Sequence, residues 1–433
     1  MGSPASAYDV CVVGAGPAGS TCAFYLARQG KRVLLLDKQR FPRDKLCGDA
    51  VCARAQGHLE RMGVLQAVLA AGEGRWAEYG GFVSPSGVPC LASSTAGGAK
   101  PLVIAIKRVV LDARVARAAA GAGAELVEDT PVARADFSPA DGLWTIHCQT
   151  RPARRYAARA LVIADGALSR LARALGLVTT PPDAACSRSY IAPGTSDFAA
   201  DGVLFYPASL LPGYCSVFRE ADGSFSFCCY VIPGGATRLT DLKARHHDLL
   251  AGDPHLRSAL GPAARLEPMR AAPLRLGGVP RSTGDHVLVI GDAAGHIDPL
   301  TGEGIQYAMD GAEIAAGTLA EAFEAGDLGE PFLQRYHRRW MAAFGRDFRW
   351  SRAMAHAYVR HPVLLDASAE MMRRRGSAYF MEWAQAMTGL KPKRALVGPR
   401  VVASVLREVA RLRWAGPQSG AASTGGPLTA GRP

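Results

Sequence analysis

Residues 8–19, YDVCVVGAGPAG, decide the fold of this chain. The apolar run Tyr8–Val13 predicts a strand, and the segment that follows the glycines predicts a helix. Between them, Gly14, Gly16 and Gly19 permit a tight turn, a close approach of backbone to a pyrophosphate, and close packing of the helix on the strand. Strand, turn and helix together predict the dinucleotide-binding part of a doubly wound α/β domain.

A second strand, Val33–Leu36, ends on Asp37, about twenty residues beyond the glycines. A carboxylate at that distance hydrogen-bonds a ribose hydroxyl in dinucleotide-binding folds. Much later, Gly291–Ile305 reads GDAAGHIDPLTGEGI, after the apolar run His286–Ile290 and before a long helical pattern. A strand that leads into a glycine-rich turn and a helix N-terminus gathers backbone N–H groups at one point. These two distant stretches therefore predict two parts of one site for an anionic cofactor.

The composition is that of an ordinary globular chain. A length of 433 residues predicts two lobes, or one large α/β domain with an inserted sheet. No run of about eighteen uncharged apolar residues and no secretory signal occurs, so we expect no membrane span and a cytoplasmic location. The ten cysteines form no CxxC pair, which predicts reduced thiols and no metal site.

The net charge of +12 is concentrated at one end of the chain. Residues 331–433 hold 18 Lys and Arg against 5 Asp and Glu, a net +13 that leaves −1 for residues 1–330. Basic clusters such as Arg373–Arg375 and Lys391–Arg394 alternate with apolar stretches. This pattern suits peripheral attachment to an anionic inner membrane face, where each nearby cation contributes about 1 kcal/mol. The alternative is a solvated, arginine-rich helical face; nucleic acid is not an expected partner.

The pattern of the chain changes after residue 185. Residues 185–232 alternate short strands with turns at Pro212-Gly213 and Asp222-Gly223, which predicts an antiparallel sheet inserted into the α/β scaffold. Residues 331–414 are expected to be mostly helical. Residues 415–433 are rich in Gly, Ser and Pro and are predicted to be a disordered tail.

Several motifs together resemble the FAD-dependent oxidoreductases related to para-hydroxybenzoate hydroxylase, and within them the geranylgeranyl reductase family. The motifs are the glycine fingerprint, Ala164-Asp165-Gly166 with Ser169 and Arg173, and the GDAA of residues 291–294. The strings PLTGEGI (299–305) and RDKLCGD (43–49) are similar to the prenyl reductase pattern, whose Cys-Gly turn lies near the flavin. The resemblance covers roughly residues 8–325 and continues more weakly to residue 410.

The resemblance implies a set of site residues. It implies FAD as the cofactor and NAD(P)H or ferredoxin as the electron donor. The implied cofactor-binding residues are Gly14, Gly16, Gly19, Asp37, Lys38, Arg43, Cys47, Arg108, Asp165, Asp292, Gly302, Gly304 and Ile305. The implied catalytic residues are Cys47, Gly48 and Tyr214, and the proton donor is Cys47, a tyrosine or water.

The implied activity is reduction of C=C bonds in an isoprenoid chain, of geranylgeranyl or prenyl-quinone type, by hydride transfer from N5 of reduced flavin. The expected protein is a monomer with a hydrophobic or lipid substrate. Alternatives are an FAD-dependent monooxygenase of aromatic or polyketide compounds and a non-catalytic flavoprotein that binds lipid or a partner. The sequence argues against a standard halogenase, because the WxWxIP segment of that class needs two tryptophans and none lies between Trp144 and Trp340.

One departure concerns the substrate pocket. Prenyl reductases commonly show YxWxFP on the substrate sheet, whereas residues 213–219 read GYCSVFR. Tyr214 and Phe218 fit that pattern, but Ser216 and Arg219 replace the Trp and the Pro. The smaller Ser216 predicts a wider tunnel or a different substrate.

The predicted fold class is therefore α/β, a Rossmann-type FAD-binding domain with an inserted antiparallel sheet for the substrate and a helical C-terminal region. FAD-binding segments are expected at 1–80, 107–180 and 286–328, and substrate-sheet segments at 81–106 and 181–285. A basic helical region at 329–414 and the tail at 415–433 complete the chain.

Overall fold

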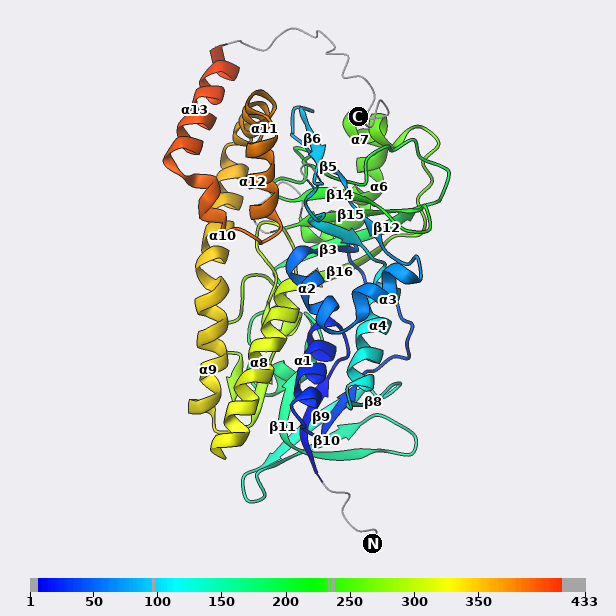
Figure 1. Cartoon of the computed structure of the whole chain (residues 1–433), viewed down its shortest axis with the longest axis vertical. Helices are drawn as coiled ribbons and strands as arrows, with labels where there is room; N and C mark the ends of the chain where they lie inside the picture. Colours follow the sequence, from blue (N-terminus) through cyan, green and yellow to red (C-terminus); the bar gives the residue numbers. More distant parts are fainter. Residues whose placement is uncertain (1–6, 96–97, 233, 235–237, 415–433) are drawn as a thin grey trace.

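The structure is a computed structural model that describes residues 7–95, 98–232, 234 and 238–414. The tail predicted at 415–433 lies outside the described residues. The molecule is elongated, with one sheet toward the end that carries the N-terminus and a second sheet toward the other end (Figure 1). Helices α8 (Ile305–Ala325), α9 (Glu330–Trp340) and α10 (Arg346–Arg360) run along one side.

The first sheet is the doubly wound scaffold that the glycine fingerprint predicts. Its order is β17-β18-β11-β1-β2-β8, and the neighbours from β18 to β8 are parallel. An antiparallel hairpin, β9 and β10, extends the sheet beside β11. The strands are β1 (Tyr8–Val13), β2 (Val33–Leu36), β8 (Glu125–Val127), β9 (Val132–Ser138), β10 (Leu143–Cys148), β11 (Arg155–Ile163), β17 (Thr283–Gly284) and β18 (Val287–Val289).

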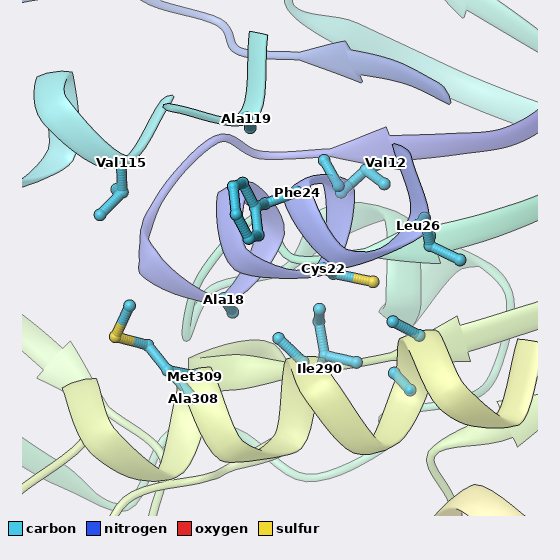
Figure 2. Packing of buried hydrophobic residues seen from close by; sticks show 14 of the residues in the cluster. Val12, Ala18, Cys22, Phe24, Leu26, Val115, Ala119, Ile290, Ala308 and Met309 are labelled. Atoms are coloured by element: carbon cyan, nitrogen blue, oxygen red, sulfur yellow. The ribbon is translucent and has the colours of Figure 1, made fainter. Parts of the chain in front are cut away.

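Helix α1 (Pro17–Arg28) lies between α8 and α4 (Arg108–Gly121) on one face of this sheet. Figure 2 shows Val12 and Ile290 from the strand ends packed with Ala18, Cys22 and side chains of α4 and α8. Small side chains on α1 let the neighbouring backbone approach closely, since a Cβ on Gly291 would lie 2.7 Å from that of Ala18. The turn after β1 and the turn after β18 are therefore packed against each other.

The second sheet forms the other end of the molecule, in the order β16-β12-β15-β14-β13-β5-β6. All neighbours are antiparallel except β13 and β5. Its outer face is covered by α6 (Leu242–Gly252) and α7 (Pro254–Leu260). The strands are β5 (Tyr79–Val83), β6 (Pro89–Ser93), β12 (Ala184–Ile191), β13 (Gly202–Phe205), β14 (Tyr214–Arg219), β15 (Phe225–Val231) and β16 (Arg270–Leu274).

A small third sheet is built from strands that alternate along the chain with the first strands of the second sheet. It consists of β3 (Ala50–Cys52), β7 (Val103–Ala105) and β4 (Arg75–Trp76), all antiparallel. The remaining short helices of this part are α2 (Ala53–Arg61), α3 (Val64–Ala70) and α5 (Arg170–Ala174). This sheet carries Cys52, the residue before α2, toward the start of α8.

The C-terminal region is helical, as its pattern predicts. After α10 come α11 (Val363–Arg375), α12 (Ser377–Met387), a short 3₁₀ turn at Lys393–Val397 and α13 (Pro399–Trp414). Helices α11 and α12 cover the inner face of the second sheet through Met372, Phe380 and Trp383. In the described part of the chain, no helix has the length and hydropathy that crossing a bilayer requires.

The predicted fold class, α/β with an inserted antiparallel sheet and a helical C-terminal region, is confirmed by this architecture. The proposed segment boundaries differ from the strands at three places. The second sheet begins at Tyr79, before the proposed residue 81, and β7 within 81–106 pairs with β3 instead of the second sheet. Strand β17, within 181–285, pairs with β18 in the first sheet.

Candidate functional site

One cavity of about 520 Å³ lies between the first sheet, the second sheet and α12. On the first-sheet side, which we call the nucleotide end, it is lined by Gly16, Pro17, Lys38, Arg108, Asp165 and Asp292. On the second-sheet side, the apolar end, it is lined by Leu204, Tyr214, Phe218, Tyr230, Phe380, Trp383 and Met387. Cys47, Gly48, Gly302, Glu303 and Gly304 lie in the lining between these groups of residues. The cavity therefore joins a polar site to an apolar one.

The three fingerprint glycines have different surroundings. A Cβ on Gly14, whose φ is +101°, would lie 2.4 Å from the Ala164 carbonyl oxygen, and a Cβ on Gly19 would lie 1.8 Å from the Gly14 carbonyl oxygen. A Cβ on Gly16 would have only the Arg43 guanidinium nearby, at 3.9 Å. Gly14 and Gly19 thus permit the packing of the turn, whereas Gly16 leaves backbone open to the cavity.

A chain of buried ion pairs stands behind the nucleotide end. Asp37, only 4% exposed, accepts hydrogen bonds from the Ala15 amide (2.9 Å) and from Arg43 Nη2 (3.0 Å). Arg43 Nη1 also contacts Asp112 at 2.8 Å, and Asp112 binds Arg108 through Nε (2.6 Å) and Nη2 (2.9 Å). The pairs hold Arg108 at the cavity wall, while Asp37 and Arg43 lie behind that wall.

Two carboxylates line the nucleotide end. Lys45 Nζ lies 2.7 Å from Asp292 Oδ2. Although burial works in the opposite direction, this cation lowers the pKa of Asp292 below its ordinary value. Burial raises the pKa of Asp165, and its Oδ1 atom has no hydrogen-bond partner within the described residues. Asp165 thus presents an acceptor that a bound hydroxyl or amide can satisfy.

The loop of residues 298–304 is held from inside the molecule. Asp298 Oδ1 accepts the amides of Leu300 (2.8 Å) and Thr301 (3.0 Å). Its Oδ2 accepts the Ser351 hydroxyl at 2.9 Å and lies 3.1 Å from Lys393 Nζ. Asp298 and Lys393 are both fully buried, so the C-terminal region fixes the loop that lines the cavity. Lys393, predicted within a basic surface cluster, is an interior residue.

His296 supports the preceding turn, residues 291–296, from inside the molecule. Its ring stacks on Trp340 of α9, with 4.2 Å between centroids and 11° between planes. The Gly291 amide donates to His296 Nδ1 at 3.2 Å. Burial lowers the pKa of His296 to about 3, so the ring is neutral and acts as a packing and hydrogen-bonding group.

Glu303 belongs to the loop of residues 298–304, two residues before α8 begins at Ile305. Its carboxylate accepts hydrogen bonds from the Cys52 thiol and from the Gln306 side-chain amide. Gln306 Nε2 also donates to the Thr388 carbonyl at 3.0 Å, which links Glu303 to the end of α12. Burial raises the pKa of Glu303 to about 7, against the opposing effects of the Cys52 hydrogen bond and the Lys393 charge.

The Cys47-Gly48 turn lies against the second sheet. A Cβ on Gly48 would be 3.3 Å from Ser216 Oγ and 3.6 Å from Cys228 Cβ, so little room exists beside this turn. Ser216 itself lines the cavity. Burial raises the pKa of the Cys47 thiol to about 11, even though Arg108 opposes the effect. Cys47 is therefore a neutral thiol at ordinary pH.

Aromatic rings form much of the apolar end. Tyr214 lies 5.8 Å from Tyr206 and 5.5 Å from Tyr230, measured between ring centroids. The Tyr214 hydroxyl donates to the Thr301 carbonyl, and burial raises its pKa well above the ordinary value. Trp383 of α12 closes the wall, with its ring centroid 4.5 Å from that of Phe82. These rings suit an apolar, unsaturated ligand.

Most of the predicted site residues come together at this cavity. Those that line it are Gly16, Lys38, Cys47, Gly48, Arg108, Asp165, Tyr214, Asp292, Gly302, Gly304 and Ile305. Gly14, Gly19, Asp37 and Arg43 do not line it and support it from behind. For Asp37, the predicted ribose contact would have to compete with Arg43 for the same oxygen atoms.

Residues outside the predicted set also line the cavity. They are Lys45, Cys52, Glu303, Trp383 and Thr388, among others. The RDKLCGD and PLTGEGI motifs contain Lys45 and Glu303, so their place beside the cofactor site could have been found from the motifs. Nothing in the local pattern of residues 377–388 indicates that α12 forms part of the wall.

A flavin dinucleotide fits the residues that line the nucleotide end. Gly16 offers backbone without a side chain, and a methyl group there would project into the cavity. Lys38, Lys45 and Arg108 bring positive charge to the same wall, as a pyrophosphate requires. The unpartnered Asp165 oxygen offers an acceptor. Among the described residues, no group of three or more His, Cys, Asp or Glu side chains is arranged to hold a metal ion.

Comparison with known proteins agrees with this fit. A family described as FAD binding domain matches residues 7–346. The chain is 47% identical over 420 residues to conditioned medium factor receptor 1 of Dictyostelium discoideum, which covers 94% of this chain and 82% of that protein. It is 29% identical to digeranylgeranylglycerophospholipid reductase 1 of Methanopyrus kandleri, covering 80% and 90% of the two chains. It is 32% identical to menaquinone reductase of Mycolicibacterium smegmatis, covering 71% and 75%.

Solved structures share the architecture. A geranylgeranyl bacteriochlorophyll reductase-like protein from Thermoplasma acidophilum superposes with a TM-score of 0.74 at 21% identity, covering 90% of this chain and 98% of that one. A flavin-dependent halogenase superposes with a TM-score of 0.66 at 19% identity, covering 95% and 70%. At these identities the similarity concerns the fold, which reductases and halogenases have in common.

Proposed function

We propose that this chain, which belongs to the FAD binding domain family and to its geranylgeranyl reductase branch, reduces C=C bonds in an isoprenoid chain. The observation that carries the proposal is one continuous cavity that joins the glycine turn at Gly16 to an aromatic, apolar wall. Relatives named for reduction of a digeranylgeranyl lipid and of a menaquinone support a substrate of this chemical class.

Bound, reduced FAD supplies a hydride from its N5 atom. The chain would hold the cofactor with the backbone at Gly16, with Lys38, Lys45 and Arg108, and with Asp165. The residues of the apolar end would place an alkene carbon beside the flavin and exclude water. NAD(P)H or ferredoxin is the proposed electron donor.

The proposed catalytic residues Cys47, Gly48 and Tyr214 would form the wall next to the reacting carbons. Gly48 leaves no side chain between the turn and Ser216, and Cys47 contributes an uncharged thiol. Tyr214 holds the flavin-facing loop through the Thr301 carbonyl. A neutral, rigid wall of this kind favours an apolar substrate, because burying an unpaired charge there would be costly.

Apolar contact can supply the affinity for such a substrate. Each buried CH₂ group contributes about 0.8 kcal/mol, so one five-carbon isoprene unit contributes roughly 3 to 4 kcal/mol. The ring faces of Tyr214, Tyr230 and Trp383 add contact surface without a polar requirement. A long prenyl chain would therefore bind without specific polar recognition.

The direct test is product mass spectrometry. Reduced holoenzyme is incubated anaerobically with a panel of prenyl lipids, and a mass gain of two per reduced bond is expected. The competing function is an FAD-dependent monooxygenase, supported by the shared fold of flavoprotein monooxygenases and halogenases. Oxygen consumption in a fixed ratio to a hydroxylated product, with no reduced lipid, would show that the competing function is correct.

We also propose that α13 attaches the protein to an anionic lipid surface. Val402 (39% exposed), Leu406 (55%) and Trp414 (94%) leave apolar surface on a helix that lies at one end of the molecule (Figure 1). The single carboxylate of α13, Glu408, is buried and pairs with Arg374 and Arg411. Exposed apolar groups beside exposed arginines are typical of helices that lie in a bilayer interface. An enzyme attached in this way could take up a lipid substrate from the membrane to which it is bound.

Vesicle sedimentation tests this attachment. The protein should sediment with phosphatidylglycerol vesicles at low salt and less so at high salt, because salt screens the arginine charges. Leu406→Glu should weaken sedimentation about tenfold or more, since it places a carboxylate in the apolar contact. Leu69→Glu, at an exposed leucine of α3, is the matched control and should bind like the wild type. If sedimentation with vesicles changes neither with salt nor in Leu406→Glu, the proposed attachment is wrong.

A further inference from the structure

Prenyl reduction needs a proton as well as a hydride, and the cavity has few groups able to give one. In the described part of the chain, three carboxyl side chains line it: Asp165, Asp292 and Glu303. Asp292 is paired with Lys45 at 2.7 Å. Asp165 follows β11 and belongs to the nucleotide end. Glu303 alone connects with α12, through Gln306 and the Thr388 carbonyl, and therefore stands nearest the apolar end.

The other groups with a polar hydrogen near the apolar end either donate it to a backbone carbonyl or are weak acids. The Tyr214 hydroxyl donates to the Thr301 carbonyl. The Tyr230 hydroxyl points to the Pro299 carbonyl at 3.4 Å. Cys47 keeps its proton up to a pKa of about 11, which makes it a poor acid near neutral pH. These groups stabilise the cavity wall and are unsuitable as proton donors. Another residue must therefore transfer the proton.

We propose that Glu303 is the catalytic acid that protonates the second alkene carbon, with Cys52 and Gln306 as the positioning residues that aim its carboxyl into the cavity. The inference rests on the proposed prenyl reduction. It differs from the assignment of proton delivery to Cys47, a tyrosine or water that the family resemblance suggests.

The surroundings of Glu303 suit this role. An acid works best when its pKa lies near the working pH, and burial raises the pKa of Glu303 to about 7. Lys393 and the Cys52 and Gln306 hydrogen bonds limit that rise, whereas the Asp298 charge adds to it. The ionisable groups that act on Glu303 or respond to it come from five separate elements of the chain; they are Cys52, Tyr214, Asp298, Tyr307 and Lys393.

The step balances as follows in atoms and electrons. Bound, reduced FAD would supply the hydride for the C–H bond at one alkene carbon, so the substrate would gain the two electrons that FAD loses. The other carbon forms a C–H bond with the Glu303 proton, and the O–H bond of the carboxyl breaks. The carboxylate that remains takes a proton from water before the next turnover. The electron donor of the enzyme then reduces FAD again.

The test compares Glu303→Gln with Cys47→Ala in reconstituted holoenzyme. Reoxidation of the reduced flavin by a prenyl lipid is followed anaerobically from pH 5 to 9. The wild-type rate should fall as pH rises through about 7, because only the protonated carboxyl is active. Glu303→Gln should lose about 100-fold or more in this rate and also lose the pH dependence. Glu303→Asp should recover part of both, and Cys47→Ala should keep the wild-type pH dependence.

Two measurements separate this role from a structural one. Glu303→Gln should retain flavin absorbance and lipid affinity, so that only the rate changes. Infrared spectra of the wild type should contain a carboxylic C=O band that titrates near pH 7 and is missing from Glu303→Gln. An unchanged rate in Glu303→Gln, or no such band in the wild type, would overturn the role of Glu303 alone. A wild-type holoenzyme that reduces no prenyl lipid would overturn the proposed function as well.

Discussion

At the nucleotide end of the cavity the contacts come from backbone and from charges set by neighbouring turns, whereas at the apolar end they come from side chains of distant helices and strands. Gly16 lines the first end because it has no side chain. Trp383 lines the second because α12 packs across the second sheet onto Phe82. The first end can be recognised from local motifs, although ion pairs such as Lys45–Asp292 join distant segments there. The second end depends on the packing of side chains, so mutations at the two ends should have separable effects.

The largest effect is expected from Gly19→Val, which tests whether the nucleotide end depends on close backbone packing. Its Cβ would lie 1.8 Å from the Gly14 carbonyl oxygen, which no side-chain movement can relieve. The loss in free energy of unfolding should exceed the ~1–3 kcal/mol of ordinary overpacking. Little soluble, folded protein should be recovered, as judged by circular dichroism and thermal unfolding. Gly317→Ala, at a helix position with open space, should fold normally.

Gly16→Val should separate cofactor binding from folding at the nucleotide end, because it should block binding of the cofactor without disturbing the turn. The nearest atom to its Cβ is the Arg43 guanidinium at 3.9 Å, so the apoprotein should unfold within about 1 kcal/mol of the wild type. The side chain would occupy the space of the pyrophosphate, and the purified protein should lack the visible absorbance of flavin. Full yellow colour in this variant would contradict the assignment of Gly16.

Trp383→Leu should give the smallest of these effects and confine it to the apolar end. Removal of ring surface beside Phe82 should raise KM for a prenyl substrate about tenfold, equivalent to about 1.4 kcal/mol. Flavin absorbance should be unchanged. Trp350→Leu, at a tryptophan of α10 that is 37% exposed, serves as the control and should keep the wild-type KM. Flavin loss in Trp383→Leu would mean that the two ends are not independent.

The sequence predicts the nucleotide end well because each of its signals is local. The spacing of Gly14, Gly16 and Gly19 and the GDAA turn depend on neighbours a few residues away, and the structure brings both turns to one cavity. Asp37 has the predicted position in the chain, yet its oxygens are bound by Arg43. The motif gives the distance in sequence between the glycines and the carboxylate. It does not indicate that a cation binds the same carboxylate oxygens.

The C-terminal region shows what a local pattern cannot reveal. Lys393 belongs to a basic cluster by sequence, and such clusters are usually solvated. In the structure it is fully buried between Asp298 and Asp347, because α10 and the 3₁₀ turn that contains Lys393 fold against the cavity loop. The helical pattern of α12 indicates an apolar face and does not indicate that this face covers the second sheet. Partners far apart in sequence are specified only by the assembled fold.

The pairing of Asp298 with Lys393 also has a consequence for how the protein is made. A ribosome delivers the chain from its N-terminus, so the glycine turn and both sheets emerge before residue 393. Until then Asp298 has no cation beside it, and the loop that carries Gly302 and Gly304 lacks its internal support. We therefore expect the loop of residues 298–304 to reach its final conformation only after the last helices have been synthesised.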